Sequence, residues 1–195
     1  LEDLQGLTMR IPSLGGEVFR RAGGVPVTMQ VSEVFTALQT GALDATEFVS
    51  PYNDLAAGYH TVAEYYYYPG WHEPGSTLET IFNKEKFESL PKDLQEILMA
   101  GTEIMNQLLL DELMARNNEA LRVLVEEHGV QLRKLPDDVL TELHRISEDV
   151  VLEMSSVDDQ TAKVYESWKN FRDNVIDYNR IAEEAFIEAR NLPFN

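Results

Sequence analysis

Three charged side chains early in the sequence have types and settings that could bind a small anion. Arg10 lies in the strand-like run LTMRIP, Glu47 in GALDATEF and Glu73 in YYYYPGWHEPG. A guanidinium group presents five donors in a rigid plane and can form two parallel hydrogen bonds with one carboxylate. Two further carboxylates would repel that anion unless a cation lay between them. An arginine followed by two glutamates therefore predicts a site for a small organic acid together with a metal ion.

Composition narrows the class of function. The chain has 195 residues, 44% of them hydrophobic, which can supply a sizeable core. A formal net charge of −18 argues against a nucleic-acid partner and disfavours an anionic membrane surface. Cysteine is absent, which removes disulfides, zinc thiolates and thiol nucleophiles. No apolar run approaches the ~20 residues of a membrane helix.

The elements that must position these side chains alternate in the first third of the chain. We expect strands at residues 7–11, 26–31 and 42–49, separated by helices at 14–22 and 33–40. Ser32 is a suitable N-cap for the second helix, and Gly41 a suitable residue to end it. Strands separated by helices of this length predict parallel βαβ units, and so an α/β fold.

The rest of the chain changes character and is mostly helical. We expect a turn at 51–54, a short helix at 55–63 and strands at 64–68 and 76–83. Apolar residues at helical spacing predict helices at 91–128, 136–155 and 158–190, with a brief strand at 130–135.

These motifs resemble those of the solute-binding receptors of TRAP (tripartite ATP-independent periplasmic) transporters. The resemblance rests on MRIP, on the pattern G-x-x-D-A-x-E ending at Glu47, and on YYPGWHEPG, and it extends over essentially the whole chain. It is greatest with the branch that binds 2-oxo and 2-hydroxy monocarboxylates, such as pyruvate and lactate, with a metal ion. It implies a two-lobed α/β fold of the periplasmic-binding-protein type (type II-like), with the N-terminal part missing and a long helical C-terminal tail.

The resemblance also implies a division of the chain. Residues 1–48 would belong to the second lobe and 49–88 would return into the first. Residues 89–157 would supply helices and a short strand of the second lobe or hinge. Residues 158–195 would form a C-terminal helix that braces one monomer or joins a homodimer, and we favour the dimer.

Carried over position by position, the resemblance assigns roles to four residues. Arg10 would bind the ligand carboxylate. Glu47 and Glu73 would ligate the metal through their side chains, and Phe48 through its backbone carbonyl. Phe48 stands where this branch often has tryptophan; it keeps the carbonyl and an apolar ring but has no indole N–H to donate. Oxygen ligands of this kind suit Na⁺ or Ca²⁺.

Neighbouring polar residues have less specific readings. Tyr52 and Asn53 could contact the C2 oxygen of the ligand, although turn chemistry explains Asn53 equally well. Asp44 is expected to hydrogen-bond within the turn that follows the preceding helix. His60, His128 and His144 show no clustering along the sequence.

Alternative chemistries are weaker. His72-Glu73 resembles the start of a zincin motif, but the following Pro74-Gly75 forbids the helix that such a motif needs. Glu47 and Glu73 could form a glycosidase acid/base pair, yet paired carboxylates are common. The tyrosine run at 65–68 is better explained by packing, with alternate rings on opposite faces of a strand.

The expected function is therefore capture, not catalysis. We expect a periplasmic receptor that binds a small organic acid with a metal ion and delivers it to TRAP permease subunits in the membrane. The alternatives are a receptor of the same fold for another small acid, or an enzyme that uses Glu47 and Glu73 in a cleft. Because the sequence begins at Leu1 within an apparent turn, we expect it to be the later part of a longer chain.

Overall fold

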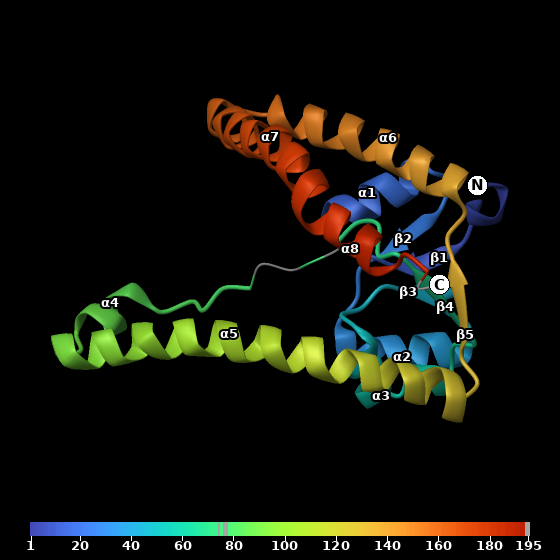
Figure 1. Cartoon of the computed structure of the whole chain (residues 1–195), viewed down its shortest axis with the longest axis horizontal. Coiled ribbons are helices and arrows are strands. Elements are labelled where there is room, and N and C mark those ends of the chain that lie inside the picture. The colour runs from blue at the N-terminus through green and yellow to red at the C-terminus, as the bar shows by residue number, and fades with distance from the viewer. Residues whose placement is uncertain (74, 76–77, 194–195) are drawn as a thin grey trace. The chain divides into compact units, whose positions relative to one another are not determined.

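A three-stranded parallel sheet lies at the centre of the first part of the chain. In this computed structural model, which describes residues 1–73, 75 and 78–193, a 3-10 turn (Glu2–Leu4) leads into the sheet. The strands have the order β2-β1-β3. Their connections place α1 on one side of the sheet and α2 on the other (Figure 1). The bounds are β1 (Thr8–Arg10), α1 (Ser13–Arg21), β2 (Val25–Val27), α2 (Val31–Thr40) and β3 (Ala45–Thr46).

Helix α1 packs closely on the end of β1. A Cβ atom at Gly16 would lie 2.8 Å from the carbonyl oxygen of Ile11, so only glycine allows this approach. Val18 and Phe19 of α1 are buried, as is Ile11. The close packing fixes the direction in which the chain leaves Arg10.

Helix α2 covers the other side and carries its own apolar core. Val34 and Ala37 of this helix are buried with Leu43 and Tyr59, and Phe48 packs against them. Gln30 and Glu33 form a capping box at the start of α2, and Gly41 ends it in the left-handed conformation at φ 74°. The β2-α2-β3 connection is thus fixed at both ends.

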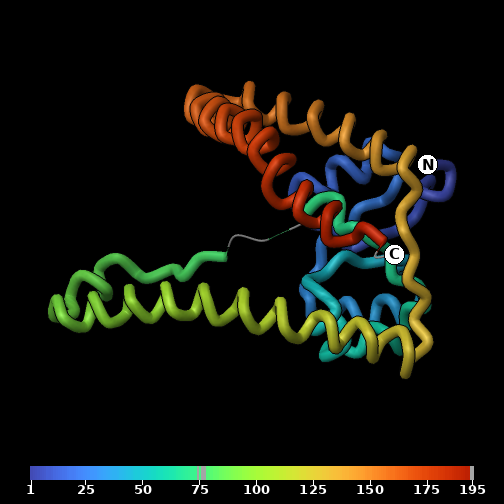
Figure 2. The backbone as a smooth tube through the Cα atoms, in the orientation of Figure 1, coloured from blue at the N-terminus to red at the C-terminus, as the bar shows by residue number. Residues whose placement is uncertain are grey.

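A second, two-stranded sheet joins distant parts of the sequence. Helix α3 (Pro51–Ala57) and a 3-10 turn (Tyr59–Thr61) lead into β4 (Tyr65–Tyr68). This strand pairs in parallel with β5 (Gln131–Lys134). Between them the backbone passes along residues 78–90 and returns through α5, as Figure 2 shows.

The two ends of the long helix α5 differ in how far their apolar side chains are buried. Helix α4 (Lys84–Glu88) precedes α5 (Lys92–Arg122), which continues into a π-helical turn (Val123–Glu127). The C-terminal end of α5 packs on α3, and Ala120 and Leu124 are buried there. We refer to α4 and residues 92–114 as the α5 arm. Its large apolar side chains are exposed: Leu94, Ile97, Leu98, Met99, Ile104, Met105, Leu108, Leu109, Leu110 and Met114.

The C-terminal part is helical, and contacts divide the chain into Leu1–Ile146 and Ser147–Asn195. Helix α6 (Asp137–Ser155) crosses this division; α7 (Asp159–Asn179), a π-helical turn (Arg180–Glu184) and α8 (Ala185–Arg190) follow. Within the second unit Arg172 pairs with Glu148 at 2.6 Å and lies over the Trp168 ring. None of the helices in the described part of the chain combines the length and apolar character that a membrane crossing requires.

The structure confirms most of the expected elements and corrects others. The parallel βαβ arrangement, the long helices and the strands at β4 and β5 agree with expectation. Ser32 is inside α2, because Gln30 is the N-cap. The strand expected at 42–49 is reduced to Ala45–Thr46. The turn expected at 51–54 is wrong, because Pro51 begins α3 as a favourable first residue.

The strand expected at 76–83 is not formed in the residues that the structure describes. Residues 78–83, the described part of the strand expected at 76–83, have no regular structure, and residues 76–77 lie outside the described residues. The tyrosine strand also differs from expectation, because only Tyr66 is partly buried while Tyr65, Tyr67 and Tyr68 are exposed. The division of the chain into lobes stays a prediction.

Candidate functional site

Arg10 and Glu47 meet at the carboxyl edge of the central sheet. Strands β1 and β3 are parallel, so their last residues reach the same edge. The backbone nitrogen of Glu47 donates to the carbonyl oxygen of Arg10 at 3.2 Å. Their side chains form an ion pair, and the exposed fractions are only 15% for Arg10 and 10% for Glu47. Arg10 and Glu47, which are far apart in the sequence, thus form a largely buried ion pair.

The guanidinium of Arg10 retains binding capacity. Its Nη1 donates to Oε1 of Glu47. Its Nε is buried and has no hydrogen-bond partner among the described residues. Because a buried donor without a partner costs free energy, an incoming carboxylate that accepts from Nε would relieve that cost.

His72 and Glu73 complete the cluster from a distant segment. Nε2 of His72 lies 3.5 Å from Oε2 of Glu47, the oxygen that Arg10 does not use. Ligand atoms of Glu47, His72 and Glu73 all lie within 4.8 Å of one another. Glu73 is exposed, whereas His72 is partly buried. The structure therefore brings together Arg10, Glu47 and Glu73 and adds His72.

Phe48 forms an apolar wall beside this cluster. Its ring meets Tyr59 edge to face, with ring centroids 5.3 Å apart and an angle of 80° between the planes. Burial raises the pKa of Tyr59, and the carboxylate of Asp54 adds to that effect. Phe48 thus anchors the residue after Glu47 in the core around α2, and its role as a carbonyl ligand stays a prediction.

Tyr52 and Asn53 are engaged in local structure. The backbone nitrogen of Tyr52 donates to Oδ1 of Asn117 at 3.0 Å, and the guanidinium of Arg116 lies over its ring. Oδ1 of Asn53 accepts from the Ser50 hydroxyl at 2.7 Å. The contact with a ligand oxygen stays a prediction for both residues.

Asp44 has a longer reach than expected. Its carboxylate accepts from the backbone nitrogen of Thr8 at 2.8 Å, and its own nitrogen donates to the carbonyl oxygen of Thr8 at 2.8 Å. These contacts join the segment before β3 to the first residue of β1. Asp44 therefore helps to set the alignment of the strands that carry Arg10 and Glu47.

Sequence reasoning missed a buried carboxyl group near these residues. Asp54 of α3 is 8% exposed, and its Oδ2 accepts from the Tyr66 hydroxyl of β4. Its Oδ1 is buried without a partner among the described residues. The pKa of Asp54 is raised to about 6. Burial is the main cause, the nearby charge of Glu47 adds to it, and the hydrogen bond from Tyr66 opposes it. Recognising α3 as a helix after Ser50-Pro51 would have placed Asp54 in its first turn.

Two histidines are neighbours despite their separation in the sequence. The rings of His60 and His128 stack with centroids 4.0 Å apart and an angle of 30° between the planes. Burial lowers the pKa of His60, and the charge of His128 lowers it further. The sequence does not indicate this pair, because the 3-10 turn after α3 and the end of the long helix meet only in the folded chain.

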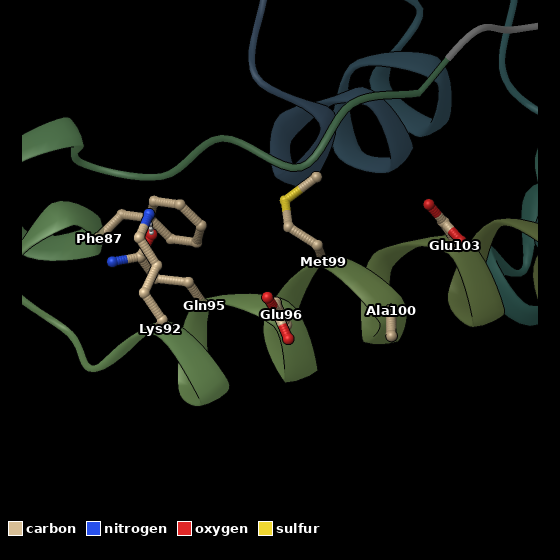
Figure 3. Close-up of a pocket in the computed structure, with 7 residues that line it drawn as sticks. All are labelled: Phe87, Lys92, Gln95, Glu96, Met99, Ala100 and Glu103. Carbon is tan, nitrogen blue, oxygen red and sulfur yellow. Dashed lines mark hydrogen bonds between the residues drawn. The ribbon is translucent and has the colours of Figure 1, made fainter.

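A separate hollow of about 390 Å³ lies along the α5 arm. Phe87, Lys92 and Gln95 lie together at one end of it, with Met99 and Glu103 further along the helix (Figure 3). The hollow shares no residue with the Arg10 cluster. It lies on the exposed part of α5 and not at the carboxyl edge of the sheet.

Comparison with known proteins identifies relatives that match most of this chain. The model of the family described as bacterial extracellular solute-binding protein, family 7, matches residues 1–157. A monocarboxylate 2-oxoacid-binding periplasmic protein of Nostoc is 39% identical over 186 residues, which cover 95% of this chain and 51% of the Nostoc protein. The chain thus spans about half the length of that relative.

Solved structures of TRAP solute-binding proteins also match most of this chain. A TRAP solute-binding protein of Pseudoalteromonas atlantica, with bound sodium and pyruvate, is 34% identical with a TM-score of 0.89. The match covers 96% of this chain and 57% of that protein. A TRAP protein of Bordetella bronchiseptica, a mixed-occupancy dimer with calcium and picolinate, is 32% identical with a TM-score of 0.92, covering 97% and 56%.

Proposed function

The chain belongs to the bacterial extracellular solute-binding proteins of family 7, and we propose that it is part of a periplasmic TRAP receptor for a small 2-oxo or 2-hydroxy monocarboxylate. The receptor would bind a pyruvate-like or lactate-like acid with Na⁺ or Ca²⁺ and deliver it to membrane permease subunits. The family is one of transport receptors and not of enzymes.

The observation that carries the proposal is the convergence of Arg10, Glu47 and Glu73 at one edge of the sheet. Arg10 would bind the carboxylate of the acid through donors that Glu47 does not use. Glu47, Glu73 and the carbonyl of Phe48 would ligate the cation. Cation and anion each neutralise charge that would otherwise be costly in a partly buried site.

The ligand class follows from chelation. A carboxylate with a second donor atom on the adjacent carbon can bind one cation through both groups. Pyruvate offers a 2-oxo oxygen, lactate a 2-hydroxyl and picolinate a ring nitrogen. The sodium–pyruvate and calcium–picolinate complexes of the two similar proteins support this class. A receptor for another chelating acid is therefore the second candidate, because the same geometry would accept it.

Calorimetry on the full-length protein tests the proposal. After chelation and removal of sodium, pyruvate, lactate and picolinate are titrated with and without added Ca²⁺. We expect the acid to bind only with the cation, and Glu47→Gln or Glu73→Gln to weaken both. Since linkage is reciprocal, the acid must tighten the cation by the same factor. Glu85→Gln on α4 is the matched control. Equal affinity in the presence and absence of cations would overturn the metal-dependent proposal.

We also propose that residues 158–190 mediate a homodimer. The exposed fractions of Phe171, Ile181 and Phe186 on these helices are 69%, 78% and 67%. The dimeric state of the Bordetella bronchiseptica protein supports this assignment. Light scattering on the full-length protein should give a dimer mass, and deletion from Asp158 onward a monomer mass. A monomer mass at every concentration of the intact protein would leave the bracing role.

A further inference from the structure

The imidazole of His72 is held in a position that its own hydrogen bonds do not explain. Both ring nitrogens are buried, and neither has a hydrogen-bond partner among the described residues. A Cβ atom at Gly15 would lie 3.2 Å from Cδ2 of His72, so the ring sits against α1. The Trp71 ring lies 5.1 Å away. Since buried polar groups are normally paired, an imidazole with two unpaired nitrogens indicates a missing partner.

The distance from His72 to Glu47 suits a shared ion better than a hydrogen bond. The separation of 3.5 Å between Nε2 and Oε2 exceeds the usual hydrogen-bond length. Ligand atoms lie about 2.0–2.6 Å from a divalent ion, so adjacent ligands of an octahedral ion are about 2.8–3.7 Å apart. Ligands on opposite sides of an ion are about twice the bond length apart. The three ligand atoms here lie within 4.8 Å of one another, so all three can reach one ion.

The same geometry indicates which atom of Glu47 faces the ion. Arg10 occupies Oε1, which leaves Oε2 on the side of His72. Glu73 follows His72 directly, so both can reach one point from a single turn of the chain.

We propose that His72 is a metal ligand alongside Glu47 and Glu73, and that this mixed set of nitrogen and oxygen atoms binds Mn²⁺. Carboxylate oxygens suit Mn²⁺ as well as Ca²⁺, whereas an imidazole nitrogen favours a transition ion over Na⁺ or Ca²⁺. The inference rests on the proposed function, because it uses the same two glutamates. It adds a ligand and an ion that the oxygen-only site does not include.

Electron paramagnetic resonance on the full-length protein tests this assignment directly. Chelator-treated protein is titrated with MnCl₂, and free Mn²⁺ is measured from its six-line spectrum. We expect His72→Gln to weaken Mn²⁺ binding by at least about tenfold, the scale on which residues of metal sites act. His144→Gln, the same substitution at an exposed position of α6, should leave the affinity unchanged. Equal Mn²⁺ affinity in wild type and His72→Gln would overturn the inference.

A second measurement does not depend on the folding of a variant. Spin-echo modulation of Mn²⁺ bound to the wild-type protein should contain the signal of a directly coordinated ¹⁴N nucleus. A bound Mn²⁺ without that signal removes His72 from the ligand set.

Ca²⁺-dependent pyruvate binding separates this inference from the proposed function. If His72→Gln retains pyruvate binding with Ca²⁺ within about threefold while Mn²⁺ binding falls, both stand. If wild-type protein binds pyruvate with Ca²⁺ but Mn²⁺ shows no nitrogen coordination, only the inference falls. If Glu47→Gln leaves Ca²⁺-dependent pyruvate binding unchanged, the proposed function falls first.

Discussion

The sheet region and the α5 arm use similar apolar residues to opposite effect. In the sheet region Ile11, Val34 and Leu43 are at most 2% exposed. In the α5 arm Ile104, Leu108 and Met114 are 59%, 53% and 74% exposed. The first region buries its apolar side chains between a sheet and two helices, and so can hold Arg10 and Glu47 in place. An apolar periodicity in the sequence therefore indicates a surface suited to packing, but does not tell whether the described residues cover that surface.

The largest expected effect separates the two regions by stability. Leu43→Ala removes a side chain from the core around α2 and should lower the free energy of unfolding by about 2–5 kcal/mol. Leu108→Ala in the α5 arm should change it by no more than about 0.5 kcal/mol. Urea denaturation of the 195-residue chain followed by circular dichroism measures both.

The same two variants in the full-length protein test whether other residues cover the α5 arm. A cost for Leu108→Ala that is present there and absent from the 195-residue chain would show that other residues cover the α5 arm. Equal costs for Leu43→Ala and Leu108→Ala in the 195-residue chain would contradict the contrast itself.

The next effect concerns ligand affinity. Arg10→Lys keeps the charge but loses the planar fork, so it should weaken binding of the organic acid by about 1.5–3 kcal/mol, the range for hydrogen bonds to charged groups. Arg122→Lys on α5 is the matched control, because its side chain is 60% exposed and pairs with Glu126. Calorimetry on the full-length protein measures both. Identical affinities for wild type and Arg10→Lys would exclude Arg10 as the carboxylate anchor.

A buried carboxyl group gives the sheet region a pH dependence. The folded pKa of Asp54 is raised to about 6, above its unfolded value. The folded state therefore binds more protons, and the stability contributed by Asp54 is complete at low pH and lost as pH rises through 6. Asp54→Asn should remove this loss, so it should gain on the order of 2–3 kcal/mol relative to wild type between pH 4 and pH 8.

Metal-free protein provides the cleanest measurement of this effect. Chemical denaturation at several pH values gives the two stability curves. Tyr66→Phe removes the hydrogen bond that lowers the pKa of Asp54, and should move the loss to higher pH. Parallel curves for wild type and Asp54→Asn would show that Asp54 does not titrate between these limits.

The smallest expected effect lies on α5, at an ion pair between Glu112 in the α5 arm and Arg116 just beyond it. Glu112 and Arg116 form an ion pair at 3.0 Å with side chains 51% and 54% exposed. Glu112→Gln should cost at most about 0.5 kcal/mol in low salt, and less at high ionic strength. Denaturation in two salt concentrations measures it. A cost above 1 kcal/mol would mean that the pair is shielded from solvent, contrary to the exposure of both side chains.

Much of the fold could be predicted because local signals were strong. Gly41 and Gly129 end helices, both in the left-handed conformation, and long apolar periodicity marked α5 and α6. The strand expected at 42–49 is longer than the observed β3, because the residues on either side of Ala45–Thr46 belong to loops although their types also suit a strand. Pro51 was interpreted as a turn residue, although it is equally suited to the first turn of a helix.

The site was predicted less evenly. Motif context predicts a shared site for Arg10 and Glu47, which the single charges alone do not, and the structure pairs the two side chains; their roles in binding stay predictions. His72 was set aside with the zincin reading, since its proximity to Glu47 arises only when β4 positions the following turn. Asp54 and Tyr66, and likewise His60 and His128, pair across the fold. No spacing rule connects them, because one contact joins α3 to β4 and the other joins the 3-10 turn after α3 to the end of the long helix.

The parallel pairing of β4 with β5 has a consequence for chain architecture. Glu64 accepts from the nitrogen of Gln131, and Tyr68 from that of Leu135, so residues 69–130 form an excursion whose two ends are fastened together. The entropic cost of bringing the two ends of a loop together depends only weakly on the length of the loop: doubling that length costs about 0.6 kcal/mol. Insertions in the irregular residues 78–83 would thus leave the strand before His72 and Glu73 in register. A change in the length of the excursion is therefore compatible with the same binding edge.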